Sequence, residues 1–341
     1  MRKLATVRRI RDIKDIGGAD KIQLASVDGW TVVVRKGEFK VGELVIYFEI
    51  DSWVPHDVAP FLSNPNQENI FEGIRGNRLK TKKLRGETSQ GLILPLSHSL
   101  KMEFYHASNP NRMPIEDDDF TEILGILKWE PEIPEEMKKI AVGAVPWFVP
   151  STSLERIQNI RDESIFEETY DVTEKLDGMA LAIMETEDGN LRIFSRGWEL
   201  KYSEDSIFAR GAKTVEKNMI GTYGYVVQGE LVGPGIAKNK YKLDELRFYV
   251  YKIYDIKKRQ YVSPEIRRQM CKIKKFLQVP VVDGSFLVDQ WVDPKDAILK
   301  MADGKSEINS KVLREGLVFQ SWNSDKEFKA ISNNFLVKHD E

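Results

Sequence analysis

A lysine beside a carboxylate and a glycine is the strongest candidate for chemistry in this chain. Lys175 and Asp177 lie in the run Asp171-Val-Thr-Glu-Lys-Leu-Asp-Gly178, and a second apolar run leaves from Ala180 to Met184. Lysine attacks as a nucleophile only when neutral, so its site must lower its pKa by burial, by nearby cations or by a metal. The stretch therefore predicts an amine presented to a phosphate. Alone, Lys-x-Asp-Gly occurs by chance in roughly one chain in ten, as a turn after a strand.

Further groups of polar residues lie at predicted strand ends in the second half of the chain. They are Ser195-Arg196-Gly197, Gly229-Glu230-Leu-Val-Gly233, the aromatic strand Phe248-Tyr-Val-Tyr251-Lys-Ile-Tyr-Asp255, and Glu315-Gly-Leu-Val318 followed by Lys329. The carboxylates Asp177, Glu230 and Glu315 could hold Mg²⁺ (or Mn²⁺), directly or through the waters that magnesium tends to keep. Alternatively, these carboxylates are ordinary strand-end side chains, and the aromatic strand belongs to the core.

The composition limits the possible functions. A length of 341 residues suggests two domains, and 51 lysines and arginines against 53 aspartates and glutamates leave a formal charge of −2. Any nucleic-acid binding must therefore rest on a local basic patch. One cysteine and four scattered histidines exclude an internal disulfide framework and a Cys/His zinc site. No apolar run is long enough to span a membrane, so we expect a soluble, cytoplasmic or otherwise intracellular protein without a membrane partner.

The first part of the chain has the pattern of a small β-barrel. Runs of apolar or β-branched residues at 6–10, 22–27, 30–35 and 44–48 are separated by glycine-containing turns, and Asp28-Gly29 is a hairpin signal. This pattern resembles the OB fold, and the segment around the hairpin resembles the tRNA-binding OB modules attached to synthetases.

A basic segment follows in the same part of the chain. Its cationic residues, interrupted by Gly76 and Gly86, are Arg75, Arg78, Lys80, Lys82, Lys83 and Arg85. We expect a mobile cationic loop that binds a nucleic-acid phosphate backbone. The alternative is a solvated basic loop without a ligand.

The second part of the chain mixes helices and strands. Strands are predicted at 225–231, 248–256, 317–320 and 328–331, and helices at 153–160, 203–217, from 264 to about 277, and from 294 to about 304. Because strands and helices do not alternate regularly, the sheet should be mainly antiparallel in an α+β domain. The predicted organisation is an OB-like nucleic-acid-binding domain at 1–140, a linker at 141–152 and a second domain at 153–341, which the resemblance given next implies to be an adenylyltransferase domain.

The order and spacing of the five polar groups resemble the covalent nucleotidyltransferases, which include ATP-dependent DNA and RNA ligases and mRNA capping enzymes. DNA ligases and capping enzymes carry their OB domain after the last lysine motif, whereas here only twelve residues follow Lys329. The chain therefore resembles the OB-first branch of ATP-dependent RNA ligases, the Naegleria RNA ligase type. This resemblance implies an α+β fold in which an N-terminal OB-like β-barrel precedes an antiparallel-sheet, ATP-grasp-like nucleotidyltransferase domain.

The resemblance also implies roles for individual residues. Lys175 would attack the α-phosphate of ATP to form lysyl-AMP, and Lys329 would neutralise that phosphate. The nucleotide-binding residues would be Glu174, Arg196, Glu230, Lys329 and one aromatic ring. Tyr251 is the preferred ring for stacking on adenine, and Phe248 stays open because a slip of one residue reverses which rings face inward.

Two positions depart from the family pattern. Ile331 stands where related ligases often have a second lysine, and Lys252 replaces an aspartate. The expected activity is RNA repair by a monomer that joins a 3′-OH strand to a 5′-phosphate end, in a nicked duplex of RNA or of RNA and DNA. The alternatives are a non-catalytic RNA-binding protein with a degenerate nucleotidyltransferase domain, or a DNA ligase or mRNA guanylyltransferase.

Overall fold

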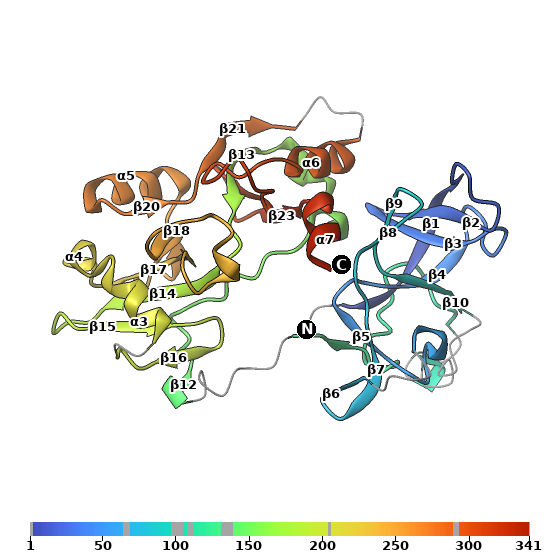
Figure 1. The fold of residues 1–341 in the computed structure, drawn as a ribbon, viewed down its shortest axis with the longest axis horizontal. Helices are drawn as coiled ribbons and strands as arrows, with labels where there is room; N and C mark the ends of the chain where they lie inside the picture. Colours follow the sequence, from blue (N-terminus) through green and yellow to red (C-terminus); the bar gives the residue numbers. More distant parts are fainter. Residues whose placement is uncertain are drawn as a thin grey trace. The chain divides into compact units, whose positions relative to one another are not determined.

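The computed structural model describes residues 3–63, 69–96, 105–107, 109, 112–130, 139–203, 206–288 and 293–340 (Figure 1). The chain forms two compact units, Met1–Glu132 with Leu336–Glu341, and Ile133–Phe335. No helix within the described ranges is long and apolar enough to cross a membrane.

Strands predicted from alternating apolar residues build the first sheet of the first unit. The sheet has the order β10-β4-β1-β2-β3, with β1 (Ala5–Asp15), β2 (Ile22–Val27), β3 (Trp30–Arg35), β4 (Leu44–Phe48) and β10 (Leu92–Pro95). Asp28 has a φ of 54° in the turn that pairs Val27 with Trp30, as the hairpin signal predicts. The strands predicted at 6–10, 22–27, 30–35 and 44–48 are confirmed.

A second sheet of the first unit contains part of the basic segment. Its order is β11-β5-β7-β6, with β5 (Ser52–Pro55), β6 (Ile70–Phe71), β7 (Ile74–Arg78) and β11 (Leu127–Lys128); a 3₁₀ turn η1 (Pro60–Leu62) and a hairpin of β8 (Lys82–Leu84) and β9 (Glu87–Ser89) complete the unit. The predicted mobile cationic loop is therefore wrong. Arg75 and Arg78 lie on β7, Lys82 and Lys83 lie on β8, and Arg85 has a φ of 52° in the hairpin turn, because these segments find strand partners.

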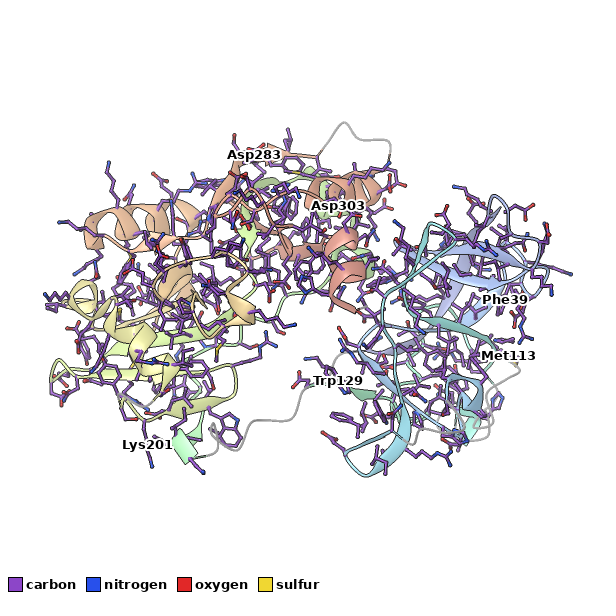
Figure 2. All side chains as sticks on the ribbon, in the orientation of Figure 1. Phe39, Met113, Trp129, Lys201, Asp283 and Asp303 are labelled. Atoms are coloured by element: carbon purple, nitrogen blue, oxygen red, sulfur yellow. The ribbon has the colours of Figure 1, made fainter. Side chains whose placement is uncertain are left out.

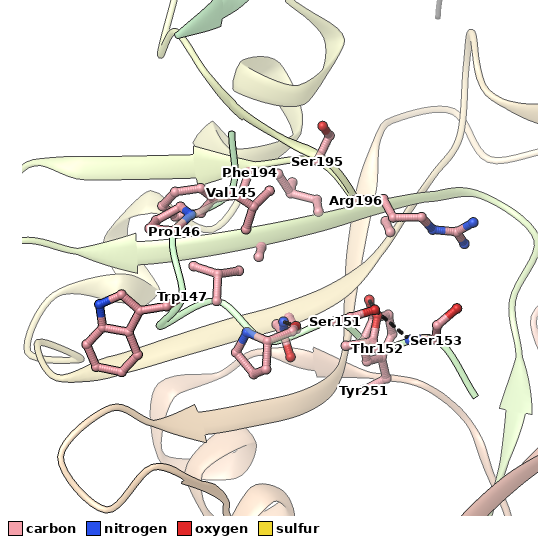
Figure 3. Close-up of a pocket in the computed structure, with 16 residues that line it drawn as sticks. Val145, Pro146, Trp147, Ser151, Thr152, Ser153, Phe194, Ser195, Arg196 and Tyr251 are labelled. Carbon is pink, nitrogen blue, oxygen red and sulfur yellow. Dashed lines mark hydrogen bonds between the residues drawn. The ribbon is translucent and has the colours of Figure 1, made fainter. Parts of the chain in front are cut away.

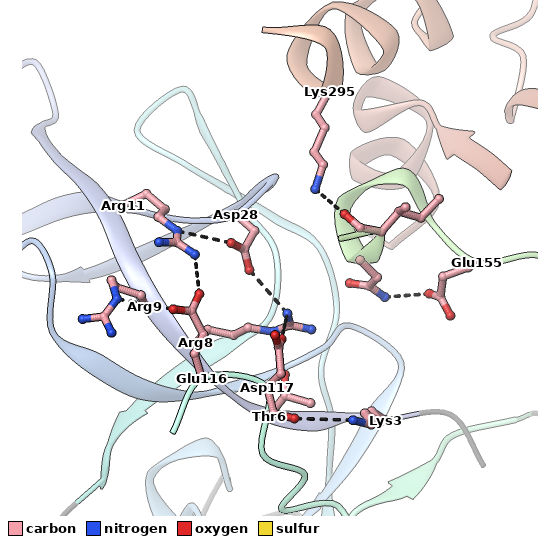
Figure 4. Close-up of polar contacts among 12 residues, drawn as sticks. Lys3, Thr6, Arg8, Arg9, Arg11, Asp28, Glu116, Asp117, Glu155 and Lys295 are labelled. Atoms are coloured by element: carbon pink, nitrogen blue, oxygen red, sulfur yellow. Dashed lines mark hydrogen bonds and ion pairs between the residues drawn. The ribbon is translucent and has the colours of Figure 1, made fainter. Parts of the chain in front are cut away.

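Acidic residues compensate the arginines of β1 (Figure 4). Nη1 of Arg8 lies 2.7 Å from Oδ1 of Asp117 and 3.6 Å from Oδ2 of Asp28. Arg11 pairs with the same Asp28 at 3.4 Å and with Glu116. Positive charge that could attract a polyanion to this unit must therefore come from other residues than these arginines.

Two antiparallel sheets build the second unit. One has the order β12-β16-β15-β14-β17-β18-β19, and the other has the order β21-β13-β22-β23. Their strands are β12 (Ala141–Ala144), β13 (Thr169–Lys175), β14 (Met179–Glu185), β15 (Leu191–Phe194), β16 (Trp198–Leu200), β17 (Tyr225–Val232), β18 (Arg247–Asp255), β19 (Gln260–Tyr261), β21 (Val281–Leu287), β22 (Gly316–Ser321) and β23 (Glu327–Ile331). A short strand β20 (Leu277–Gln278) pairs with β18 in parallel. The expectation of a mainly antiparallel sheet is confirmed.

Two helices begin at their predicted caps. The helices are α3 (Ile207–Lys213), α4 (Glu216–Met219), α5 (Pro264–Lys274) and α6 (Pro294–Ala302) in the second unit, and α7 (Asn333–Asp340), whose residues from Leu336 belong to the first unit; the 3₁₀ turns are η3 (Ile157–Asn159), η4 (Glu163–Glu167) and η5 (Ala237–Asn239). Ser263 and Asp293 accept backbone hydrogen bonds from Ile266 and Asp296, which fixes the starts of α5 and α6.

The helix predicted at 153–160 is wrong. Only the turn η3 forms there, because the backbone N–H of Lys329 in β23 donates to the carbonyl of Glu155 at 2.9 Å and Arg156 bridges to Lys329. The residues expected to be a linker, 141–152, belong to the second unit: they form β12 and a segment that lies over its larger sheet.

Strand alternation puts the polar residues of both sheets on faces away from the cores. Tyr170 and Val172 of β13 enter the core of the smaller sheet, so Lys175 lies on its other face. Val227 and Leu231 of β17 enter the core of the larger sheet, so Glu230 lies on its other face. The contacts between these polar faces form the candidate site.

Candidate active site

Lys175 is the last residue of β13 and pairs with Gly316 of β22. Its Nζ lies 2.7 Å from Oε1 of Glu315, and the two side chains are 28% and 18% exposed. Burial lowers the pKa of Lys175, but the charges of Glu315, Glu230 and Asp177 outweigh it, and the pKa lies above its usual value. This direction is opposite to the one that a lysine nucleophile needs, so the charges of its carboxylate neighbours must be offset before Lys175 can attack.

The turn after Lys175 is fixed by contacts with two other segments. The backbone N–H of Asp177 donates to the hydroxyl of Tyr241 at 2.9 Å, and Nζ of Lys240 donates to Oδ2 of Asp177 at 2.7 Å. The N–H of Gly178 donates to Oε1 of Glu230 at 3.0 Å. A Cβ at Gly178 would lie 2.4 Å from the carbonyl oxygen of Leu231, so only glycine permits this approach. The Lys-x-Asp-Gly pattern therefore needs its glycine for packing.

Lys240 and Tyr241 are site residues that sequence reasoning missed. Nζ of Lys240 lies 4.4 Å from the ring centroid of Phe335 and is held against Asp177. Both residues follow the Gly233-Pro-Gly235 turn, and the backbone at Lys238 and Asn239 has positive φ values. The glycine and asparagine residues between Gly233 and Asn239 are a turn signal that could have predicted a chain reversal here. They could not have predicted which strand Lys240 and Tyr241 would contact.

Glu230 has an unusual protonation equilibrium. Burial raises its pKa, the charge of Lys175 opposes this, and the charge of Glu315 raises it further, with a resulting pKa of about 7. A carboxyl with such a pKa exchanges its proton near neutral pH, which is typical of functional sites.

The three carboxylates expected to hold a metal have different partners. Asp177 pairs with Lys240, Glu315 pairs with Lys175, and Glu230 accepts the N–H of Gly178. Among the residues that the structure describes, no group of three or more acidic, histidine or cysteine side chains is placed to hold a metal ion. The donor set fits an ion that keeps water and takes further oxygen ligands from a nucleotide.

A cavity of about 340 Å³ lies on the polar face of the larger sheet (Figure 3). Its wall is the segment 145–153, and its floor comes from β14, β15, β17 and β18 through residues that include Ala180, Ala182, Phe194, Ser195, Arg196, Gln228 and Tyr251. This volume lies within the range of small-molecule sites, which is about 300–1,000 Å³. Trp147 and Arg196 lie toward opposite ends of the cavity in Figure 3.

The structure distinguishes the two candidate rings of β18. The ring of Tyr251 lines the cavity, and its hydroxyl lies 3.2 Å from Oγ1 of Thr152. Phe248 is 1% exposed and packs in the core of the larger sheet. The two residues are three positions apart and so lie on opposite faces of β18, and a β-bulge follows at Tyr251, because Gln228 pairs with Lys252 while Gly229 pairs with Val250.

Glu174 lies away from the cavity. It is 1% exposed, and its Oε2 accepts the N–H of Glu307 at 2.7 Å. Burial raises the pKa of this carboxyl. Its contact ties β13 to the segment that leads into Glu315, so the structure brings Glu174 to the loop around 307 and does not bring it to the cavity.

Lys329 lies on β23 opposite Val318. Phe328 and Ala330 enter the core, so Lys329 is on the same polar face as Lys175. Lys252, the residue at the family's aspartate position, is 5% exposed, and its Nζ lies 2.6 Å from Oε1 of Glu327. Lys252 thus belongs to a buried ion pair between β18 and β23.

The predicted nucleic-acid residues are divided between β7, the β8–β9 hairpin and the residues that join them. Arg78 pairs with Asp51 and stacks on Trp129, while Lys80, Lys82 and Lys83 are exposed. Arg75 is also exposed, on β7.

Comparisons with known proteins agree with this arrangement. A family model described as an OB-fold domain matches residues 4–96, and one described as RNA ligase matches residues 168–335. No curated protein matches.

Solved structures of Naegleria gruberi RNA ligase share 38% identity with the chain. A lysine-to-alanine variant with ATP and Mn has a TM-score of 0.86, and the ligase with PPi has 0.85; each match covers 99% of both chains. A glutamate-to-alanine variant with ATP and Mn matches with a TM-score of 0.85 over 100% of both chains. The predicted α+β fold, an OB domain followed by an antiparallel-sheet ligase domain, is confirmed. The chain therefore belongs to the RNA ligase family.

Proposed function

We propose that this protein is an ATP-dependent RNA ligase that works through a lysyl-AMP intermediate and seals breaks that carry a 3′-OH and a 5′-phosphate. The observation that carries the proposal is Lys175, held 2.7 Å from Glu315 on the polar face of the smaller sheet, while the polar face of the larger sheet bears a nucleotide-sized cavity. The Naegleria relatives with ATP, AMP, Mn and PPi support the choice of nucleotide and metal.

The cavity fits the nucleoside of ATP. The ring of Tyr251 offers a face on which adenine stacks, and Arg196 lies toward the end of the cavity, where it contacts the ribose or the phosphates. Lys329 shares the polar face with Lys175 and neutralises negative charge on the α-phosphate. Glu174 acts in this proposal by holding the loop before Glu315 through its bond to the N–H of Glu307.

The first step joins Lys175 to AMP. The ammonium group passes a proton to Glu315, whose Oε1 already accepts its hydrogen bond. The neutral amine attacks the α-phosphorus, a P–N bond forms, and the bond to the β-phosphate oxygen breaks and releases pyrophosphate. Asp177, Glu230 or Glu315, with waters, would hold Mg²⁺ or Mn²⁺, which would supply positive charge that offsets the phosphate and favours the neutral amine.

Two transfers complete the reaction. An oxygen of the RNA 5′-phosphate attacks the phosphorus of lysyl-AMP, and the P–N bond breaks and frees Lys175. The 3′-hydroxyl then attacks the 5′-phosphate, loses its proton, and displaces AMP. We propose that the natural substrate is a nick in a duplex and that the protein acts as a monomer.

One labelling experiment tests the chemistry. Incubation with Mg²⁺ and ATP labelled at the α-phosphate should leave an acid-labile protein adduct, and Lys175→Met should leave none. Lys201→Met, which removes an exposed lysine after β16, is the matched control (Figure 2). Absence of label on the unaltered protein would contradict the proposed activity. Preference for GTP over ATP would instead indicate the guanylyltransferase activity of mRNA capping enzymes.

A second experiment tests the substrate. Rates of joining should be compared for a nicked duplex and for the same two strands without their complement. Equal rates would contradict the nick as the substrate.

A further inference from the structure

A planar arginine lies on one face of the second sheet of the first unit. Arg78 of β7 pairs with Trp53 of β5, and Trp53 also pairs with Leu127 of β11. Trp129 follows β11, and its N–H donates to the carbonyl of Asp51 at 2.8 Å. Leu79 and Ile126, the neighbours in sequence of Arg78 and Leu127, enter the core. Strand alternation therefore gathers Asp51, Trp53, Arg78 and Trp129 on the face away from that core.

The guanidinium of Arg78 is held in a fixed plane. Its centre lies 3.9 Å from the ring centroid of Trp129. Its Nε and Nη2 both donate to Oδ1 of Asp51, at 3.1 Å and 2.6 Å. A guanidinium positioned by a carboxylate on its edge and an indole on one face is a planar group suited to stacking, and Arg78 lines a cavity.

This surface belongs to a cavity of about 740 Å³. The cavity is lined by Trp53, Asn69, Ile70, Asn77, Arg78, Lys80 and Trp129. Trp53 is itself held in place, because its Nε1 donates to the carbonyl of Ile74 at 3.1 Å, and a Cβ at Gly76 would lie 2.8 Å from that nitrogen. The volume lies within the range of about 300–1,000 Å³ for small-molecule sites, so it can take one nucleotide.

The polar groups of the cavity suit the edge of a base. Nδ2 of Asn69 donates to Oδ1 of Asn77 at 3.0 Å, and Nδ2 of Asn77 donates to Oγ of Ser63 at 2.9 Å. These bonds fix the two amides, which carry both donor and acceptor groups. Nucleobases present donors and acceptors on their edges and a flat π-face for stacking.

The charge of Arg78 favours stacking over phosphate binding. Asp51 lies 2.6 Å away and offsets its positive charge, so Arg78 attracts a phosphate less strongly than an exposed lysine. A base paired within a duplex cannot enter a cavity of this kind, whereas an unpaired base can be splayed out and stacked on an arginine plane.

We propose that this cavity binds one unpaired nucleotide of an RNA strand that flanks the nicked duplex, with its base stacked on the guanidinium of Arg78, a proposal that rests on the RNA ligase function above. Exposed Lys80 at the cavity then lies near the adjoining phosphate. The first unit thereby recognises a single-stranded segment beside the junction, in addition to any phosphate contacts of β8.

The test compares binding of intact and abasic RNA by the full-length protein. The probes are a fluorescent single-stranded RNA of about ten nucleotides, a length within the usual range of OB-fold sites, the same strand with abasic residues, and its blunt duplex. Affinity is measured over a range of salt concentrations for the unaltered protein, Arg78→Lys, Trp129→Leu and the control Lys128→Ala. Lys128 is the exposed neighbour of Trp129, so the control removes a charge without removing the stacking surface.

The unaltered protein and the control should bind intact RNA about tenfold more tightly than abasic RNA, the effect of one stacked base. Arg78→Lys and Trp129→Leu should lose this preference while the slope of affinity against salt stays the same. The proposal is overturned if abasic RNA binds the unaltered protein equally well, or if both variants keep the preference. Adenylylation of Lys175 is measured in the same samples: its failure would count against the proposed function and leave the comparison of probes intact.

Discussion

Nζ of Lys175 lies 2.7 Å from Oε1 of Glu315, and this contact raises the pKa of the proposed nucleophile more than any other single charge does. The lysine and its proton acceptor are thus already paired. The cost is that Glu315 also stabilises the ammonium form, which cannot attack. The balance between these two effects is open to measurement.

Glu315→Gln should shift the pH dependence of adenylylation to lower pH. Removing the carboxylate removes a charge that favours the ammonium form, so the pKa of Lys175 falls. The maximal rate should also fall, by about a hundredfold, because the proton acceptor is lost. Single-turnover labelling over roughly pH 6–10 measures both, because below the pKa of Lys175 the rate rises with pH and a lower pKa displaces that rise to lower pH. Glu307→Gln on the same segment is the control, and an unchanged pH dependence in Glu315→Gln would contradict the assignment.

Glu230→Gln should stabilise the protein at pH 8 and leave its stability unchanged at pH 4. The pKa of Glu230 rises from 4.5 to about 7 on folding, so the folded state binds more protons than the unfolded state between these values. Stability from this group is therefore lost as the pH rises through that interval. The gain at pH 8 should be a few kcal/mol at most, and it is measured as a shift in Tm. Adenylylation should fall in the same variant.

The control for this prediction is Asp188→Asn. Hydrogen bonds from Thr186 and Asn190 lower the pKa of Asp188. Its substitution should therefore shift Tm in the opposite direction at pH 8. A Glu230→Gln protein less stable than the unaltered one at pH 8 would contradict the sign.

Tyr251→Ala should raise the KM for ATP about tenfold, the effect of losing one base–aromatic stack. Tyr251→Phe keeps the ring and loses only the contact with Thr152, so its KM should stay close to that of the unaltered protein. Phe248→Leu should lower stability by about 1 kcal/mol and leave the KM unchanged, since Phe248 is in the core. A larger KM effect at Phe248 than at Tyr251 would reverse the assignment of the stacking ring.

Glu327→Gln should destabilise the protein by about 3 kcal/mol, because it leaves the buried ammonium of Lys252 without its partner. The double substitution with Lys252→Met should recover much of this loss. Urea unfolding of the single and double variants measures the coupling. Equal stability of Glu327→Gln and the double variant would show that the unpaired ammonium of Lys252 does not lower the free energy of unfolding.

Substitution of both Lys82 and Lys83 by alanine should weaken binding of RNA, whatever the RNA sequence. Both lysines are exposed on β8, and each phosphate contact with a single strand contributes about 0.7 to the slope of log affinity against log salt. The slope should therefore fall by about 1.4 if both bind phosphates. Adenylylation in the absence of RNA should be unaffected. An unchanged slope would show that the two lysines contact solvent and do not bind RNA phosphates.

Much of the fold was predictable because it depends on local patterns. Alternating apolar residues gave the first strands, and Asp28-Gly29 gave their hairpin, since the turn needs positive φ at Asp28. The prediction of a helix at 153–160 was wrong because this segment forms backbone hydrogen bonds with β23, which is distant in sequence. These bonds outweigh the helical preference that its apolar spacing indicates. The prediction that the basic segment is a loop was wrong for the same reason. The strands β5 and β9 supply backbone hydrogen-bond partners that local sequence patterns do not reveal.

The sequence by itself determined the prediction of the site's members, Lys175 with Asp177, Glu230, Glu315 and Lys329, from a family's spacing. Tertiary structure alone decided how these groups act. The packing of Phe248 and Val250 in the core selects Tyr251 as the ring that lines the cavity, because residues an odd number apart lie on opposite faces of a strand. Three carboxylates raise the pKa of Lys175, since a pKa depends on charges close in space and not on their order along the chain.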